Sequence, residues 1–136
     1  MLKYNTMLYI IPFYVIDLPK IKIMKIENTK AQMRKGVLEF CILSVLKNKD
    51  AYVAEILITL KEAKLLVVEG TIYPLLTQLK NSGLLNYRWE ESTTGPPRKY
   101  YTLTESGQLF LVELTTTWNE LHNAVSLVTH PKTTKK

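Results

Sequence analysis

The sequence has few of the residues on which enzymes and disulfide-stabilised proteins depend. It contains one cysteine, Cys41, so an internal disulfide is excluded and a reduced, cytoplasmic setting is expected. Its only histidines are His122 and His130, and no Cys, His and carboxylate residues cluster with metal-site spacing. No glycine-rich phosphate loop occurs, and no nucleophile has a base nearby in sequence. The composition argues against an enzyme, and neither a metal nor a cofactor is expected.

The sequence also lacks a strong charge excess in its central part. The formal net charge of +6 is concentrated at the two ends, with +2 in residues 1–23 and +3 in residues 130–136, which are expected to form a disordered basic tail. Residues 24–129 contain 12 basic and 11 acidic side chains. A nucleic-acid-binding surface would therefore have to come from local clustering of basic residues.

The sequence has no apolar run of membrane-spanning length, so no membrane partner is expected. The run over residues 7–16 is broken by Pro12 and would cross only about half of a bilayer. It is not followed by a cleavage site of small residues, which argues against a signal peptide. Met24 opens a conventional soluble sequence, so we expect translation to begin there and residues 1–23 to be an upstream extension. The alternatives are a disordered segment or an arm that covers a hydrophobic patch.

The stretch GTIYPLLTQLKNSGLL, which begins at Gly70, predicts a short helix with two unlike faces. Pro74 lacks an N–H and is expected in the first turn, so the helix should start at Gly70 or Thr71. Gly83 is expected to end it in the left-handed conformation, with Leu84 folding back onto the last turn. The apolar face, with helical spacing, consists of Ile72, Leu75, Leu76 and Leu79. The other face is polar and carries one charge; it consists of Thr71, Tyr73, Thr77, Gln78 and Lys80.

Apolar periodicity predicts two helices ahead of this stretch, over residues 29–47 and 51–63, the second capped by Asp50. A β-branched run over residues 65–68 is long enough for one small strand. Lys35 lies among basic residues in the early turns of the first helix, where they oppose the helix dipole. They favour an anionic partner, and the alternative is a solvated helix start. Two short helices joined by a compact connection, the second with a polar front, predict a helix-turn-helix.

Alternating residues after the polar helix predict a β-hairpin, with strands over residues 85–90 and 98–103 and a loop over residues 91–97. A hairpin in this place makes the unit a winged helix, so the expected fold is mainly α with a small β-hairpin wing. Arg98 and Lys99 lie where the wing returns and are expected to reach phosphates. The alternative is that this basic pair at the base of a hairpin is only solvated.

Residues 104–129 predict one long last helix, capped by Thr104, in which Gly107 lowers the helix propensity. Apolar residues recur along it at spacings of 3, 4, 3, 4 and 3, and this heptad seam consists of Leu111, Leu114, Trp118, Leu121, Val125 and Val128. Leu109 and Phe110 lie off the seam and are expected to pack back on the domain. The seam exceeds what a small winged helix can cover, so we expect a homodimer formed through this helix.

Two blocks of the sequence resemble signatures of the PadR transcriptional regulators. GTIYPLL followed by LKNSGLL is similar to the recognition-helix signature of that family, and GPPRKYYTLTESG is similar to its wing and wing exit. Their order and spacing also match, and the resemblance covers roughly residues 30–128. One departure is Ala51-Tyr52, which stands where the family often has Gly-Tyr at the start of the second helix.

The resemblance implies a sequence-specific transcriptional regulator, a dimeric repressor with a winged-helix DNA-binding domain over residues 24–103 and a dimerisation helix over residues 104–129. Members with a single long last helix can hold planar drug-like or phenolic compounds in a channel at the dimer interface, lined by a tryptophan that corresponds to Trp118. The residues expected to contact an inverted-repeat operator in double-stranded DNA are Lys35, Tyr52, Thr71, Tyr73, Thr77, Gln78, Lys80, Arg98 and Lys99.

Two alternatives stay open at this point. The nearly neutral central part is compatible with a winged helix that docks protein instead of DNA, and such docking should respond little to salt. Trp118 is compatible with a packing role, in which it fills a gap where paired helices diverge.

Overall fold

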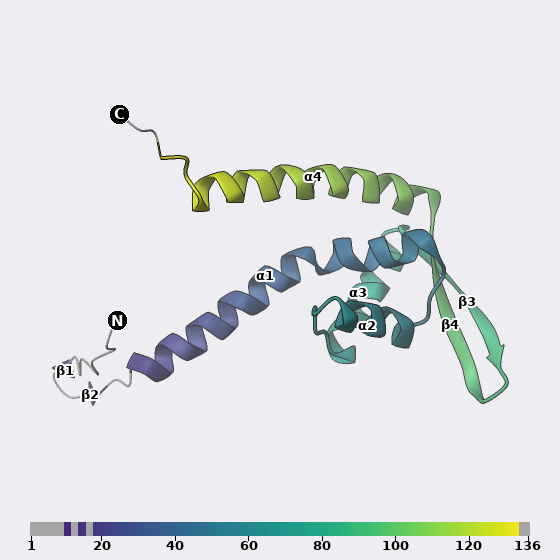
Figure 1. The fold of residues 1–136 in the computed structure, drawn as a ribbon. Coiled ribbons are helices and arrows are strands. Elements are labelled where there is room, and N and C mark those ends of the chain that lie inside the picture. Colours follow the sequence, from purple (N-terminus) through teal and green to yellow (C-terminus); the bar gives the residue numbers. More distant parts are fainter. Residues whose placement is uncertain (1–9, 12–13, 16–17, 134–136) are drawn as a thin grey trace. The chain divides into compact units, whose positions relative to one another are not determined.

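The fold is mainly helical and carries a two-stranded antiparallel hairpin over residues 85–103, as predicted (Figure 1). Residues 10–11 and 14–15 form a second antiparallel pair, which was not predicted. The computed structural model describes residues 10–11, 14–15 and 18–133. In chain order the elements are β1 (Ile10–Ile11), β2 (Tyr14–Val15), α1 (Leu18–Asn48), α2 (Val53–Glu62), α3 (Glu69–Asn81), β3 (Leu85–Ser92), β4 (Gly95–Leu103) and α4 (Glu105–Thr129). The chain divides into two compact units, Met1–Val37 and Leu38–Lys136.

The first unit contains the start of α1, which begins at Leu18 and not at residue 29 as predicted. Pro19 lies in its first turn, where a missing N–H costs nothing. Apolar residues in this part of α1 are scattered around the helix, so periodicity gave no signal for it. The alternatives for residues 1–23 fall largely on residues outside the described ones and stay predictions. None of the helices in the described part of the chain has an apolar stretch of the length needed to span a bilayer.

The second unit has one hydrophobic core, to which all of its helices and the hairpin contribute. Its buried residues are Leu38, Ile42, Leu43, Leu46, Ala51, Val53, Ile56, Leu60, Ile72, Leu76, Leu79, Leu85, Tyr101 and Leu111. Three of the four residues predicted for the apolar face of the polar-fronted helix are therefore buried, and the fourth, Leu75, packs against the core while partly exposed.

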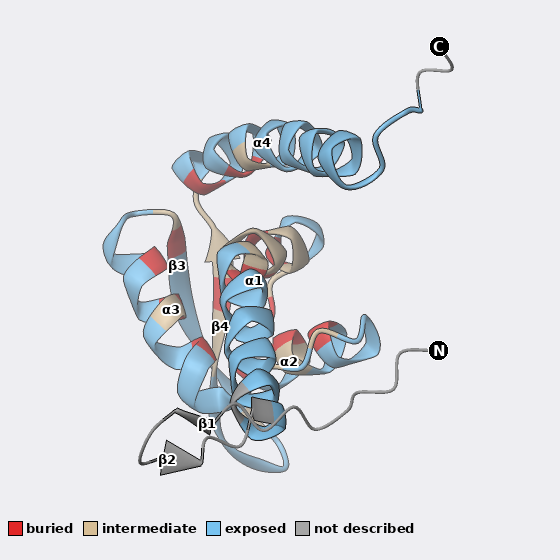
Figure 2. Cartoon of the chain, turned by 90° about the vertical axis from the view of Figure 1, so that its left-hand side faces the viewer, coloured by how far each residue is buried: buried red, intermediate tan, exposed pale blue. Residues whose placement is uncertain are grey.

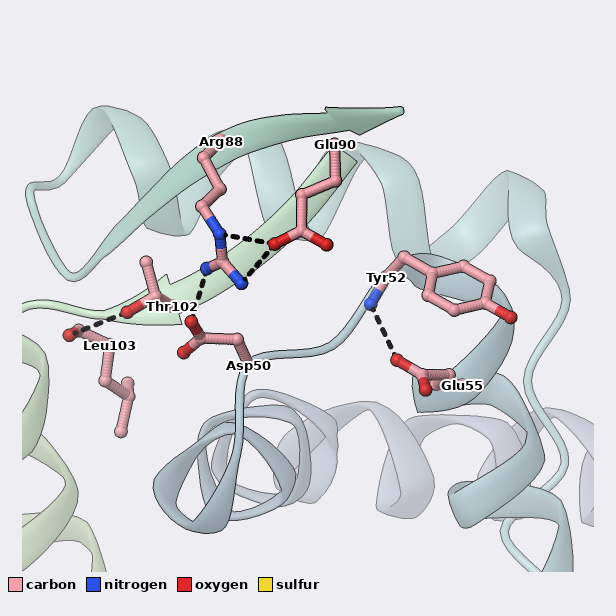
Figure 3. Close-up of polar contacts among 7 residues, drawn as sticks. All are labelled: Asp50, Tyr52, Glu55, Arg88, Glu90, Thr102 and Leu103. Atoms are coloured by element: carbon pink, nitrogen blue, oxygen red, sulfur yellow. Dashed lines mark hydrogen bonds and ion pairs between the residues drawn. The ribbon is translucent and has the colours of Figure 1, made fainter. Parts of the chain in front are cut away.

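The second helix starts two residues later than predicted, and Asp50 does not cap it. Helix α2 begins at Val53, and its N-cap is Tyr52 in an extended conformation. The backbone N–H of Tyr52 donates to the carboxylate of Glu55 at 3.2 Å (Figure 3). Glu55 therefore satisfies one of the free N–H groups at the helix start.

A tertiary contact explains why α2 starts later than predicted. Ala51 and Tyr101 exchange two backbone hydrogen bonds, of 3.2 and 2.9 Å, so Ala51 is held extended beside β4 and cannot enter the helix. Asp50 is an ion-pair partner of Arg88 in β3 instead of a cap. Neither contact can be seen in the local sequence.

The strand predicted over residues 65–68 is wrong, because this segment has no regular structure. The N–H of Leu65 donates to the carbonyl of Leu60 at 2.9 Å and closes the end of α2. Lys64 adopts a φ of 65°, the left-handed conformation in which helices often end. Leu65 and Val67 then pack against the core from the outside.

The helix at the centre of the prediction is present as α3, and its end is as predicted. Gly83 has a φ of 77°, and the N–H of Leu84 donates to the carbonyl of Leu79 at 3.0 Å. Helix α3 begins at Glu69, one residue before the expected start. Pro74 therefore lies in the second turn and not in the first, so α3 lacks one hydrogen bond within its length.

The hairpin extends further than predicted, so the loop expected over residues 91–97 is reduced to Thr93 and Thr94. The pairing shifts between Glu90 and Ser92, which marks a β-bulge near the turn. Pro96-Pro97 suggested a loop, but prolines are tolerated at the first residues of a strand. The two strands pair over almost their whole length.

Helix α4 begins as predicted, because the N–H of Gly107 donates to the hydroxyl of Thr104 at 2.9 Å. The expectation for Leu109 and Phe110 is wrong, because their side chains are 66% and 37% exposed. Leu111, with 4% exposure, and the partly buried Leu114 pack on the domain instead. Beyond these first turns α4 is mostly exposed (Figure 2).

Candidate nucleic-acid interface

The polar face of α3 is open to solvent. The predicted contact residues on it, Thr71, Tyr73, Thr77, Gln78 and Lys80, are all exposed. Tyr73, Thr77 and Lys80 follow one another at spacings of 4 and 3, so they share one side of the helix. Thr71 and Gln78 are seven residues apart and share a neighbouring stripe. Because the major groove of DNA admits an α-helix, both stripes are suitable for contacts to base edges.

A pocket of about 170 Å³, open to solvent, lies between α3 and the hairpin. It is lined by Leu76, Thr77, Lys80, Asn81, Tyr87, Lys99 and Tyr101. The ammonium of Lys99 lies 4.1 Å from the ring centre of Tyr87 and 5.3 Å from that of Trp89. The ammonium of Lys80 lies 5.6 Å from the ring centre of Tyr87. The structure therefore brings together two lysines that are far apart in sequence, around one tyrosine.

Tyr101 lines this pocket with an uncharged phenol. Tyr101 is 4% exposed, and burial, followed by the nearby Tyr73 and Tyr87, raises the pKa of its hydroxyl. It therefore stays uncharged at neutral pH and does not oppose an anion in the pocket.

The opposite face of the hairpin carries a second cluster. The guanidinium of Arg98 lies 4.6 Å from the ring centre of Tyr52, and Tyr52 makes an edge contact with Tyr100 at 5.3 Å. The guanidinium of Arg88 covers Tyr100 at 5.4 Å. Arg98 and Lys99, predicted as one basic pair, thus point to opposite faces, as neighbours on a strand must.

Arg88 fixes the connection between the hairpin and the start of α2. It forms ion pairs with Asp50 and, at 2.8 Å, with Glu90 (Figure 3). Hydrogen bonds to Asp50 and then Glu90 raise its pKa. Two carboxylates already compensate its charge, so we interpret Arg88 as a structural link and not as a phosphate contact.

The structure thus groups some of the predicted residues and separates others. Thr77, Lys80 and Lys99 line one pocket, whereas Tyr52 and Arg98 lie together on the other face of the hairpin. Lys35 belongs to the unit Met1–Val37 and is exposed there. Several residues at these clusters were not predicted from the sequence, namely Asp50, Asn81, Tyr87, Arg88 and Tyr100. Strand alternation indicated that Tyr87 and Arg88 face opposite ways, but only the register shows what each one meets.

The exposed seam of α4 starts later than predicted. Leu111 lies in the core of its own unit, and Leu114 is half-buried against it. From Trp118 onward the seam is open: Trp118, Leu121, Val125 and Val128 are 39%, 52%, 50% and 80% exposed. The indole of Trp118 lies between Phe40, with ring centres 6.3 Å apart, and His122, at 6.0 Å.

The described residues offer little for covalent or metal chemistry. They contain no group of three or more His, Cys, Asp or Glu residues that could hold a metal ion. Cys41 is partly buried, and burial raises the pKa of its thiol, which makes the nucleophilic thiolate scarcer.

Comparison with known proteins gives consistent results. The sequence model of the transcriptional regulator PadR-like family matches residues 42–113. A PadR-like transcription factor from "bacteroid fragilis" is 57% identical, with 74% of this chain and 98% of that chain covered and a TM-score of 0.63. A PadR-like transcriptional regulator from Bacillus cereus strain ATCC 14579 is 34% identical, with 74% and 99% covered and a TM-score of 0.67. A PadR family transcriptional regulator from Eggerthella lenta DSM 2243 is 26% identical, with 83% and 99% covered and a TM-score of 0.74.

Proposed function

Because the chain belongs to the PadR-like family of transcriptional regulators, we propose that it is a dimeric repressor that binds an inverted-repeat operator and is released by a small effector. On this proposal the protein acts in the cytoplasm, because its DNA target lies there. One observation carries this proposal: Thr77 and Lys80 on the polar face of α3 and Lys99 of the hairpin line one open surface. A helix that enters a groove and basic residues that flank it are what a winged helix needs for duplex recognition.

The residues divide into two roles on this proposal. Thr71, Tyr73, Thr77 and Gln78 approach base edges or phosphates in the major groove. The remaining predicted contacts hold the DNA backbone; they are Lys35, Tyr52, Lys80, Arg98 and Lys99. The guanidinium of Arg98 lies over the ring of Tyr52, which limits its freedom, and Arg98 is exposed and therefore able to reach a phosphate.

Salt dependence tests this function. For the double variant Arg98→Gln, Lys99→Gln we expect weaker binding to all duplexes alike. The slope of log affinity against log salt should fall by about 0.9 for each phosphate that the protein no longer neutralises. Affinity is measured by titration of labelled duplexes over a range of salt concentrations. Lys47→Gln is the control, because it removes one exposed charge at the end of α1.

An unchanged slope in the double variant would remove the hairpin from the interface. If the wild-type protein binds no duplex, the DNA-binding proposal fails and the protein-docking alternative takes its place. A slope that falls half as much in the control variant, which loses one charge instead of two, would mean that only the net charge matters.

The effector part of the proposal rests on Trp118. In a dimer formed through α4, two such indoles near the two-fold axis would flank a slot for a flat aromatic or phenolic ligand. Each aromatic contact contributes roughly 0.5–1.5 kcal/mol beyond its buried area. Such a ligand induces only if it binds the DNA-bound and free geometries with different affinity.

We expect planar cationic dyes or phenolic acids to quench the fluorescence of the wild-type protein, and this quenching to disappear in Trp118→Ala. Trp89 in the hairpin is 62% exposed and serves as an internal reference in the variant. Quenching that survives in Trp118→Ala, or the absence of quenching by every planar compound, would leave Trp118 with a packing role alone.

A further inference from the structure

We infer that the pocket between α3 and the hairpin is an oxyanion site that holds one phosphate of the DNA backbone, with Lys80 and Lys99 as its charged ligands. This inference rests on the proposed DNA binding and adds to it a defined subsite. It names which charges act together and predicts that they meet a single phosphate.

The first observation is that Lys99 is already held in place. Its ammonium lies within 4.1, 5.3 and 6.0 Å of the ring centres of Tyr87, Trp89 and Tyr101. A lysine usually loses much rotamer freedom when it binds, and contacts with three rings restrict this side chain in advance. The ammonium of Lys80 lies 5.6 Å from the same Tyr87 ring, and both lysines line the pocket.

The second observation is that these two charges lack an acidic partner within the part of the chain that the structure describes. The ion pairs found there join Lys30 to Glu27, Lys49 to Glu55, and Arg88 to Asp50 and Glu90. The cross-strand partner of Lys99 is Trp89, whereas that of Arg98 is Glu90. Of the two basic residues that return from the hairpin turn, Lys99 is thus the one placed opposite an uncharged side chain.

The remaining lining suits an oxyanion as well. Thr77, Asn81 and Tyr87 line the pocket, and their hydroxyl and amide groups are hydrogen-bond donors. The C-terminus of α3 is close by and would repel an anion through its free carbonyls. Three of these carbonyls are occupied, because those of Gln78, Leu79 and Lys80 accept hydrogen bonds from the N–H groups of Ser82, Leu84 and Gly83.

The geometry of DNA explains why the anion is a backbone phosphate. The major and minor grooves of a duplex are separated by one sugar–phosphate strand. If α3 lies in the major groove and the hairpin beside the adjacent minor groove, that strand must pass between them. The pocket lies between these two elements, so it faces the strand and not the base edges.

The test is a thermodynamic cycle between single lysines and single phosphates. The probe is a short duplex selected by the wild-type protein from random sequences, with each phosphate near the contact region replaced in turn by a neutral methylphosphonate. The variants are Lys80→Gln and Lys99→Met, since methionine keeps an unbranched stem over the rings without the charge. The matched control is Lys47→Gln.

We expect one methylphosphonate position in each half-site at which the wild-type protein loses about tenfold in affinity, the magnitude of one charge-assisted hydrogen bond. The same substitution should cost little in Lys80→Gln and in Lys99→Met, but should keep its full cost in Lys47→Gln. Circular dichroism spectra that match the wild type confirm that the variants are folded.

If the losses of affinity caused by a lysine substitution and by a methylphosphonate add at every phosphate position, the two lysines share no phosphate. The subsite proposal would then be wrong, although DNA binding would stand. A second arm titrates inorganic phosphate and follows the fluorescence of Trp89, which borders Lys99. Saturable binding of free phosphate that needs Lys99 but leaves duplex affinity unchanged would overturn the backbone assignment in favour of a small-anion site. If the wild-type protein binds no duplex at all, the proposed function fails and this inference fails with it.

Discussion

Replacement of Gly107 by alanine is expected to destabilise the protein by about 3 kcal/mol, at the upper end of the usual cost of overpacking. A Cβ atom at this position would lie 2.1 Å from the carbonyl oxygen of Leu84 and 3.1 Å from a side-chain atom of Leu103. The first of these atoms belongs to the backbone and has no rotamer with which to move away. Helix α4 would have to shift away from the turn that ends α3.

The shift would also break a small network of hydrogen bonds. Thr104 donates from its N–H to the carbonyl of Leu84 at 3.1 Å and from its hydroxyl to the carbonyl of Gly83 at 2.6 Å. The same hydroxyl accepts from the N–H of Gly107. This network connects the start of α4 directly to the end of α3, so we expect weaker DNA binding in the variant as well.

Urea or thermal unfolding at a fixed protein concentration measures this effect. Gly36→Ala is the matched control, because Gly36 also lies within a helix but has nothing within 4 Å of its Cβ position. There alanine should stabilise the protein by about 0.5–1 kcal/mol through its higher helix propensity. If the two variants change the free energy of unfolding equally, there is room for a Cβ atom between α4 and the carbonyl of Leu84.

Gly107 illustrates the limit of prediction from the sequence. Its position early in a helix indicated a loss of propensity, so the local rule predicts that alanine stabilises. The structure reverses the sign of that expectation, because a distant backbone atom occupies the space. Similarly, Leu109 and Phe110 were predicted to face the domain, but Leu111 packs there instead.

Features set by neighbouring residues were predicted well. Gly83 and Leu84 end α3 as expected, and Thr104 caps α4. Each of these features depends on contacts within a few residues. The start of α2 depends instead on the pairing of Ala51 with a strand some fifty residues later, and this was missed.

The candidate site was predicted in part for the same reason. The exposure of the polar face of α3 follows from helical period alone, and the structure agrees. Lys80 and Lys99 line the same pocket only because α3 packs beside the hairpin. Arg98 and Lys99 were predicted to act as a pair, but side chains alternate along a strand, so the two point to opposite faces. The ion pair of Arg88 with Asp50 forms because β3 lies beside the residues that precede α2, so neither segment alone predicts it.

The second large effect is expected from a charge in the seam of α4. The side chains of Trp118, Leu121, Val125 and Val128 are 39–80% exposed within one chain, although all four are apolar. Exposed apolar surface of this kind is usually covered by a partner. The heptad spacing gives the four residues one common line along the helix, which suits a second copy of the same helix.

Leu121→Asp is the sharpest variant for this proposed dimer. Leu121 is 52% exposed, so the fold of the single chain should tolerate aspartate, whereas Leu114 packs against the core and its replacement would confound folding with assembly. In the dimer the carboxylate would be buried without a partner, at a cost of about 3–5 kcal/mol. We therefore expect the variant to sediment as a monomer and to lose operator affinity, because each half-site loses its tethered neighbour.

Asn123→Asp is the matched control, since it adds the same charge within one turn of Leu121 but away from the seam. It should sediment like the wild-type protein and bind the operator with unchanged affinity. Sedimentation velocity at micromolar concentration measures both variants beside the wild type, and circular dichroism checks that α4 remains helical. A wild-type protein that is already monomeric at this concentration would end the proposal. A monomeric Asn123→Asp would show that added charge, and not the seam, controls assembly.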